Sequence, residues 1–164
     1  MNARAPILIG HDGSRFSRAA ARRGLSLARA LGLPAHILRS WSISTAPRPA
    51  TWSPGFVPPR EDFAAAVAEA LRQDVAPLLA EYPDVQVTFE TPHGAAGREL
   101  IRASEQAEVL VVGTRGLGGF AGLLLGSVSD QCVEHAACDV LVVRTPGIDQ
   151  APGRTLPLDA TLEG

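Results

Sequence analysis

The chain has 164 residues, which is enough for one domain with a sizeable hydrophobic core. Apolar residues make up 46% of it and aromatic residues only 5%, so we expect a core of aliphatic side chains. The net charge is −2 and the arginines are spread along the chain, which argues against nucleic acid as a partner. No apolar run reaches the length that spans a bilayer, and the N-terminus lacks a signal-peptide core. We therefore expect a cytoplasmic protein with no membrane partner.

Aliphatic runs alternate with helical periodicity along the chain. The expected strands are residues 6–11, 35–42, 85–90, 109–112 and 140–143. The expected helices are residues 14–31, 61–82, 97–107 and a segment that begins at Ser127. This alternation predicts an α/β fold: a doubly wound, Rossmann-like parallel sheet of five strands with helices on both faces. Residues 1–145 form the expected domain, and residues 146–164 are expected to be a flexible tail, because they are rich in Pro and Gly.

Two connections leave the carboxyl ends of the first two strands, where ligands bind in open α/β sheets. After the first strand, Asp12 can form an Asx turn, Gly13 permits a tight turn and Ser14 can cap the next helix. After the second strand, residues 43–60 contain five prolines and are expected to be a long loop without regular structure. Both a mobile lid over a ligand and a surface insertion fit this loop.

A glycine-dense loop follows the fourth strand. Gly113, Gly116 and Gly126, with Ser127 directly after, have the spacing G-x2-G-x9-G-S. A strand, a glycine loop and a helix start together are typical of a phosphate site, because the first amides of a helix have no partner within it. Ser127 and Asp130 also form S-x-x-D, so the alternative that Ser127 only caps its helix stays open. A Walker loop is excluded, because the chain contains no lysine.

From residue 7 to residue 144 the chain resembles the ATP-binding branch of the universal stress protein family, whose glycine motif has this spacing. The resemblance implies strand order 3-2-1-4-5, and bound ATP with Mg²⁺ held mainly by its phosphates. Asp12 would lie at the nucleoside end and the backbone at Ser40 near adenine. Arg39 stands where the family often has histidine. The implied nucleotide-binding residues are Asp12, Ser40, Gly113, Arg115, Gly116, Gly126, Ser127, Val128 and Ser129.

The resemblance implies a nucleotide-dependent stress-response regulator that forms a homodimer through its last strand, residues 140–143. Two alternatives remain: a slow ATP hydrolase, and a dimeric interaction module that holds no nucleotide. The glycine motif argues against the second. For hydrolysis the sequence offers little, since no histidine or pair of acids stands in the glycine loop to position water, and His11 ends a buried strand. We therefore expect a binding protein rather than an enzyme.

Overall fold

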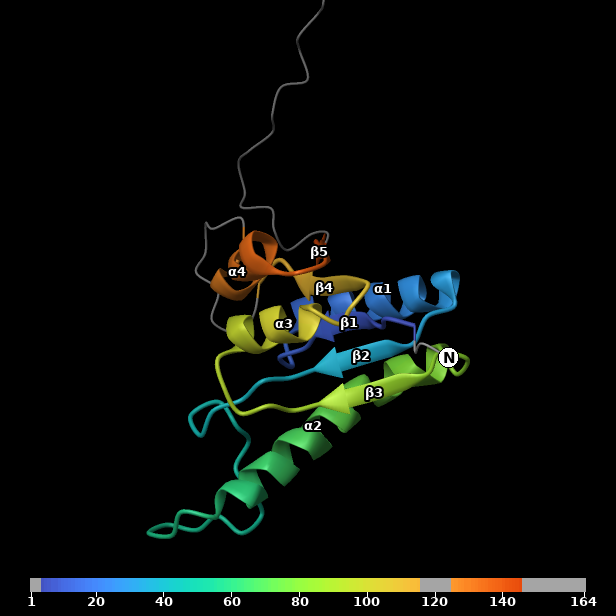
Figure 1. Ribbon diagram of the computed structural model, residues 1–164. Coiled ribbons are helices and arrows are strands. Elements are labelled where there is room, and N and C mark those ends of the chain that lie inside the picture. The colour runs from blue at the N-terminus through green and yellow to red at the C-terminus, as the bar shows by residue number, and fades with distance from the viewer. Residues whose placement is uncertain (1–3, 116–124, 146–164) are drawn as a thin grey trace, which may run out of the picture.

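The structure is a computed structural model that describes residues 4–115 and 125–145. Five strands form one sheet in which every neighbouring pair is parallel. They are β1 (Ile7–Gly10), β2 (Ala35–Leu38), β3 (Val87–Glu90), β4 (Val109–Gly113) and β5 (Asp139–Val143). Their order is β3-β2-β1-β4-β5, which confirms the predicted doubly wound sheet (Figure 1). The tail, residues 146–164, lies outside the described residues, so the domain boundary stays a prediction.

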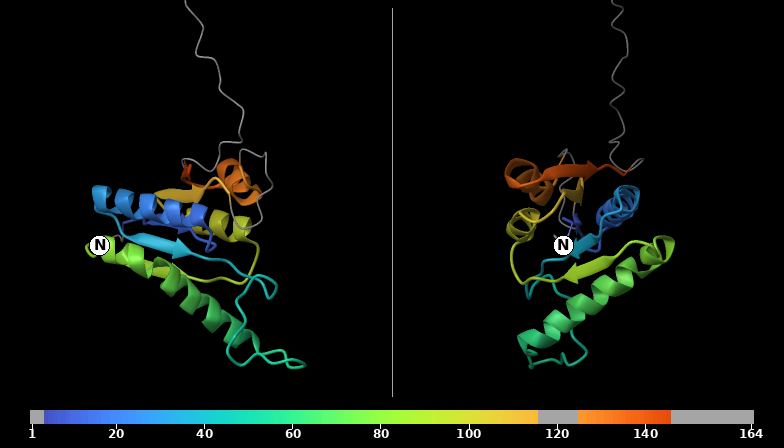
Figure 2. Two further views of the ribbon diagram at one scale, coloured as in Figure 1. Left: turned by 180° about the vertical axis from the view of Figure 1, so that it is seen from behind. Right: turned by 45° about the vertical axis from the view of Figure 1, so that its right-hand side comes forward.

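Within the described residues, four helices cover the sheet on both faces: α1 (Arg15–Leu31), α2 (Arg60–Glu81), α3 (Ala96–Ser104) and α4 (Ser127–His135). Figure 2 shows α1 on one side of the sheet, with α3 and α4 on the other. One core cluster joins α1 and α2 to the sheet and includes Leu25, Leu71, Ile7 and Ile9. A second cluster joins α3 and α4 to the opposite face and includes Leu100, Cys132, Leu8 and Leu110.

The local sequence explains where the elements begin and end. All four residues of β1 are buried, because this central strand sends alternate side chains into the two clusters. Ser14 caps α1 by accepting a hydrogen bond from the Ser17 amide, and Gly32 ends the helix. The third strand begins at Val87 instead of at residue 85, because the Val85 amide closes a turn with the Tyr82 carbonyl.

The predicted proline-rich loop contains no helix or strand from residue 43 to residue 59, and α2 begins at Arg60. The base of the loop is packed. Trp41, Phe63 and Val67 form a third apolar cluster beneath it. Its tip is a tight turn, in which the Phe56 amide donates to the Ser53 carbonyl at 3.0 Å. Figure 1 shows the segment before α2 extending beyond the sheet. The role of a lid stays a prediction. No helix among the described residues is long and apolar enough to cross a bilayer.

Candidate functional site

The candidate site lies at the carboxyl edge of the sheet, where the chain leaves the neighbouring strands β1 and β4 toward helices on opposite faces. Open α/β sheets bind ligands at such a switch point. Two strand-to-helix connections meet here. One runs from β1 through Asp12, Gly13 and Ser14 to α1, and the other ends at Gly126, where α4 begins.

Hydrogen bonds fix the turn after β1. The Asp12 carboxylate accepts from the Ser14 amide at 2.9 Å, which is the predicted Asx turn. Gly13 has φ +89°, a conformation that residues with a side chain rarely adopt. The Ser14 hydroxyl oxygen accepts from the Ser17 amide at 3.1 Å. The turn therefore presents Asp12 from a backbone whose shape is closely defined.

The start of α4 differs from the sequence-based alternative in which Ser127 is the cap. The cap position is Gly126, one residue earlier, and it has no side-chain capping bond. Ser127 is the first helical residue and is exposed. The Gly126 amide donates to the Thr114 carbonyl at 2.7 Å, which ties the start of α4 to the end of β4. The serine is therefore not needed to close its own helix.

Gly113 and Ser129 hold the two walls of the site together. A Cβ atom on Gly113 would lie 2.8 Å from the backbone carbon and oxygen of Phe16, so glycine lets α1 approach the end of β4. The buried Ser129 hydroxyl donates to the Gly113 carbonyl at 2.6 Å. Both residues were predicted to contact the ligand. The structure gives each of them a packing role next to the site.

The remaining predicted residues divide between the described chain and the part outside it. Arg115 lies two residues beyond the end of β4 and is partly buried. The side chain of Val128 packs against the core beneath α4, so only its backbone amide could serve a ligand. Gly116 lies outside the described residues. Across the described ranges, no three His, Cys, Asp or Glu side chains gather as metal ligands.

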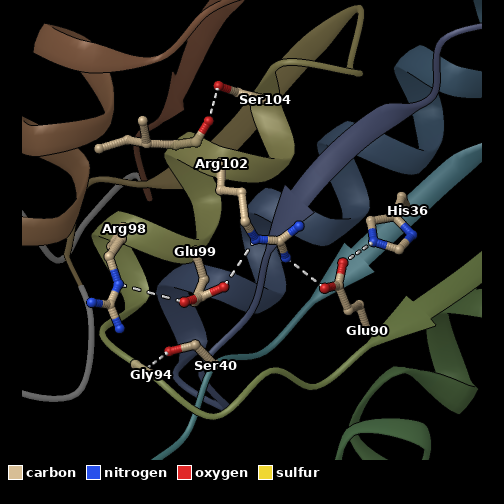
Figure 3. Close-up of polar contacts among 9 residues, drawn as sticks. His36, Ser40, Glu90, Gly94, Arg98, Glu99, Arg102 and Ser104 are labelled. Carbon is tan, nitrogen blue, oxygen red and sulfur yellow. Dashed lines mark hydrogen bonds and ion pairs between the residues drawn. The ribbon is translucent and has the colours of Figure 1, made fainter.

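Ser40 lies just beyond the end of β2, on the side of β1 away from β4. Its hydroxyl donates to the Gly94 carbonyl at 2.9 Å (Figure 3). Trp41 is 4% exposed, and its indole donates to the Thr91 carbonyl. Trp41 therefore belongs to the apolar cluster with Phe63 and Val67. Together Ser40 and Trp41 fix the connection from β3 to α3.

A chain of charged side chains continues from this connection across β2, β3 and α3. Glu90 lies between His36 and Arg102, at 3.1 and 2.6 Å. Arg102 also contacts Glu99, which in turn pairs with Arg98 (Figure 3). Arg98 and Arg102 are more than half exposed, although Glu99 is only 13% exposed. Because each of these arginine pairs has one partner in solvent, we expect modest stabilisation from it. They bind α3 to the sheet edge, and we assign them no ligand.

His11 was the histidine considered for catalysis, and it is 4% exposed. Burial lowers its pKa from 6.5 to about 4, and the neighbouring Arg39 adds to this effect. Its Nδ1 atom faces Arg39 Nη2 at 2.9 Å and accepts from the Gly13 amide at 3.3 Å. The ring is therefore neutral near pH 7, and Nδ1 already faces two donors. This arrangement does not suit a general base.

A family model described as the universal stress protein family matches residues 4–144. The chain belongs to the universal stress protein family. Its relatives include the universal stress protein Rv2623 of Mycobacterium tuberculosis, which is 33% identical over 140 residues. That match covers 85% of this chain but 45% of the relative, so the chain spans about half the length of the curated relatives it matches.

Solved structures of universal stress proteins have the same fold. A universal stress protein in complex with cAMP is 25% identical, has a TM-score of 0.64, and matches 87% of this chain and 98% of that one. UspA from Lactobacillus plantarum is 22% identical with a TM-score of 0.67, and the match covers 87% of this chain and all of UspA. The family resemblance drawn from the glycine motif is confirmed.

Sequence reasoning missed one set of residues at this edge. Arg39 was noted only as a departure from the family, and Asp74 was not singled out. The structure places the Arg39 guanidinium between His11, 28 residues earlier, and Asp74, 35 residues later. The contact between His11 and Arg39 could have been predicted from the sequence. Each residue comes at or near the end of an expected strand, and neighbouring parallel strands end at the same edge of a sheet.

Proposed function

We propose that this universal stress protein binds an adenine nucleotide, with ATP as its physiological ligand, and acts as a nucleotide-dependent regulator in the stress response. The observation that carries the proposal is the start of α4. It follows β4 at the switch point, its cap is a glycine without a side-chain bond, and an exposed serine follows. Such a helix start offers backbone amides and the positive end of the helix dipole to an anion.

The residues present suit the parts of a nucleotide. Phosphates would lie at the amides of Ser127, Val128 and Ser129, with the Ser127 hydroxyl as a further donor. The nucleoside would lie toward Asp12, after β1, and the backbone at Ser40, after the neighbouring strand β2. Mg²⁺ would be held mainly by phosphate oxygens. The related protein crystallised with cAMP supports an adenine nucleotide as the ligand class.

Hydrolysis is the second candidate, and the surroundings of His11 argue against it. A histidine whose pKa lies near 4 is a weak base, and its Nδ1 atom already faces two donors. We therefore propose a holding or sensing role. Repeated turnover of ATP by the purified protein, abolished in His11→Ala with binding retained, would restore the enzyme hypothesis.

A homodimer through β5 completes the proposal. This strand pairs with β4 on one side and is the last strand of the sheet, and its residues Val140 to Val143 are partly buried. An apolar edge strand is a template for pairing with a second chain. Leu141→Lys should convert a dimer into a monomer in sedimentation. A wild-type protein that sediments as a monomer would exclude this interface.

Calorimetric titration tests the nucleotide site. Ser127→Ala should weaken ATP binding roughly 10- to 100-fold, because a hydrogen bond to a charged group is lost. Gly126→Val should weaken it further, since a branched side chain would keep phosphates away from the backbone. Adenosine, which has no phosphates, should bind both variants as it binds the wild type. Ser26→Ala, in the middle of α1, is the matched control and should change neither affinity. Unchanged ATP affinity in both site variants would remove the start of α4 from the site.

A further inference from the structure

Three side chains from three elements meet beneath the turn after β1. His11 follows β1, Arg39 follows β2 and Asp74 belongs to α2. Arg39 Nη2 lies 2.9 Å from His11 Nδ1 and donates to an Asp74 carboxylate oxygen at 2.5 Å. The Arg39 side chain is only 11% exposed. The guanidinium therefore joins the ends of two central strands to the helix that covers them.

The contacts of His11 define its tautomer. Its Nδ1 atom faces two donors, Arg39 Nη2 and the Gly13 amide, so it must be the unprotonated, accepting nitrogen. The proton then resides on Nε2. His11 in this form can hold the Gly13 amide in place, and Arg39 holds the ring that does so. A run of hydrogen bonds thus leads from Asp74 through Arg39 and His11 to the backbone of Gly13.

Stability alone does not account for this cluster. His11 Nε2 and Arg39 Nε are buried and have no hydrogen-bond partner among the described residues. A buried donor without an acceptor costs on the order of 1–3 kcal/mol. Apolar side chains of similar volume at such positions are often as stabilising as a buried ion pair or more so. Costly polar groups of this kind in a native protein point to a role beyond holding the fold.

The guanidinium packs directly against the turn. A Cβ atom on Gly13 would lie 3.0 Å from Arg39 Nη2 and 3.5 Å from an Asp74 carboxylate oxygen. Gly13 adopts its positive φ above this surface, between Asp12 and Ser14. The Asp12 carboxylate is oriented within the same turn by the Ser14 amide. The cluster therefore supports the backbone from which Asp12 extends.

We propose that Arg39, acting through His11 and held by Asp74, is the positioning residue for the nucleoside end of the binding site. Arg39 fixes the turn that aims Asp12, and it does not itself contact the ligand. This inference rests on the proposed nucleotide function. It separates the site into a nucleoside end controlled by side chains buried under α2 and a phosphate end formed by the backbone of α4.

The test compares adenosine and ATP affinities by calorimetry, well below the melting temperature of each variant. Arg39→Met and His11→Leu should each weaken both ligands by the same factor, roughly tenfold, because the turn rather than the phosphate contacts is lost. His11→Asn places an amide oxygen near the position of Nδ1 and should restore most of the affinity. Arg22→Met removes an exposed ion pair with Glu81 between α1 and α2 and is the matched control. It should leave both affinities unchanged.

Hydrogen exchange at the Gly13 amide provides a second readout. In folded Arg39→Met and His11→Leu this amide should exchange faster than in the wild type, while His11→Asn should protect it. Variants that are less stable but bind both ligands normally, with Gly13 still protected, would overturn the inference and leave the cluster a structural one. A wild type that binds neither ligand would instead overturn the proposed function, and the inference with it.

Discussion

Two helices begin at the candidate site, and they begin in different ways. Before α1, side chains of the protein accept hydrogen bonds from the backbone amides of the turn and the first helical turn. Asp12 accepts from Ser14, the Ser14 side chain accepts from Ser17, and His11 accepts from Gly13. At α4 the cap residue is Gly126, which has no side chain to offer. The start of α2 and the start of α3 also lack a side-chain cap, but α2 follows the proline-rich loop after β2 and α3 follows the edge strand β3, whereas α4 begins beside the end of β4 at the switch point.

This difference indicates how one site can divide recognition between two chemistries. A turn whose backbone donors are used internally can present a single oriented side chain, as the first turn presents Asp12. A helix start without a side-chain cap presents amides, which favour an anion whatever its detailed shape. We expect the first turn to govern selectivity for the nucleoside and α4 to govern affinity for phosphates.

The largest expected effect is that of pH on the first turn. Protonating His11 would turn Nδ1 into a donor, so the Gly13 amide would lose its hydrogen-bond acceptor. The folded pKa of about 4 lies below the ordinary 6.5, so the unfolded chain binds more protons between these values. The free energy of unfolding should therefore rise by about 3 kcal/mol from pH 4 to pH 6.5 and then level off.

Urea denaturation across this range measures the pH effect, and His11→Asn is the control because it cannot titrate. Four charged side chains act on the pKa of His11: Arg39 and Arg18 lower it, and Asp74 and Asp12 raise it. Subtracting the His11→Asn curve of unfolding free energy against pH from the wild-type curve removes the contribution of the nearby carboxylates and leaves that of the histidine. Parallel curves would show that His11 titrates normally in the folded protein.

The next effect compares two glycines of the motif. Gly113→Ala should destabilise the fold by about 2 kcal/mol, because the new methyl group would be forced against the backbone of Phe16. Gly126 has φ −75°, which any residue adopts, so Gly126→Ala should cost no more than about 1 kcal/mol, the difference expected because alanine is a poorer helix cap than glycine. Thermal denaturation of both variants decides the matter. Equal destabilisation would contradict the division between a packing glycine and a site glycine.

Ser129→Ala tests the bond that ties α4 to β4. Removing the hydroxyl leaves the Gly113 carbonyl without its donor and should cost about 1.5 kcal/mol in the free energy of unfolding. Denaturant titration measures this cost. Ser127→Ala, two residues earlier and exposed, is the matched comparison. If both variants unfold at the same denaturant concentration, the Ser129 bond contributes nothing to stability.

The smallest effect compares the first serines of the two helices. Ser14→Ala should destabilise the protein by about 1 kcal/mol, because Ser14 caps α1. Ser127→Ala should change the free energy of unfolding by less than about 0.5 kcal/mol, since Gly126 holds the cap position of α4. Differential scanning calorimetry of the two variants provides the measurement. A cost at Ser127 equal to that at Ser14 would restore the interpretation of Ser127 as a cap.

The fold could be predicted from the sequence because its signals are local. Four-residue aliphatic strands, the cap at Ser14 and the terminating Gly32 each announce an element within a few positions. The strand order came with the family resemblance, and the sheet confirms it. Boundaries were less certain, as at Val85, where a backbone turn to Tyr82 delays the third strand.

The details of the site depend on contacts between residues that are far apart in the sequence. Gly113 is glycine because Phe16, almost a hundred positions earlier, packs against it. The sequence around Gly113 contains no trace of that contact. Arg39 meets Asp74 from a different element, and neither has a local pattern that predicts the pair. The predicted helix start at Ser127 is confirmed, but the alternative that Ser127 is the cap is wrong by one position, because the cap is Gly126.

The placement of the two tryptophans has a spectroscopic consequence. Trp41 is 4% exposed and directly follows Ser40, whereas Trp52 is 38% exposed on the proline-rich loop with Arg48 stacked 4.5 Å from its ring. Indole fluorescence shifts to longer wavelength and is quenched by iodide when the ring meets water. The protein therefore contains two optical probes with separable signals. In Trp52→Phe the remaining emission would report on Trp41 alone, and with it on the core beside the nucleoside end of the site.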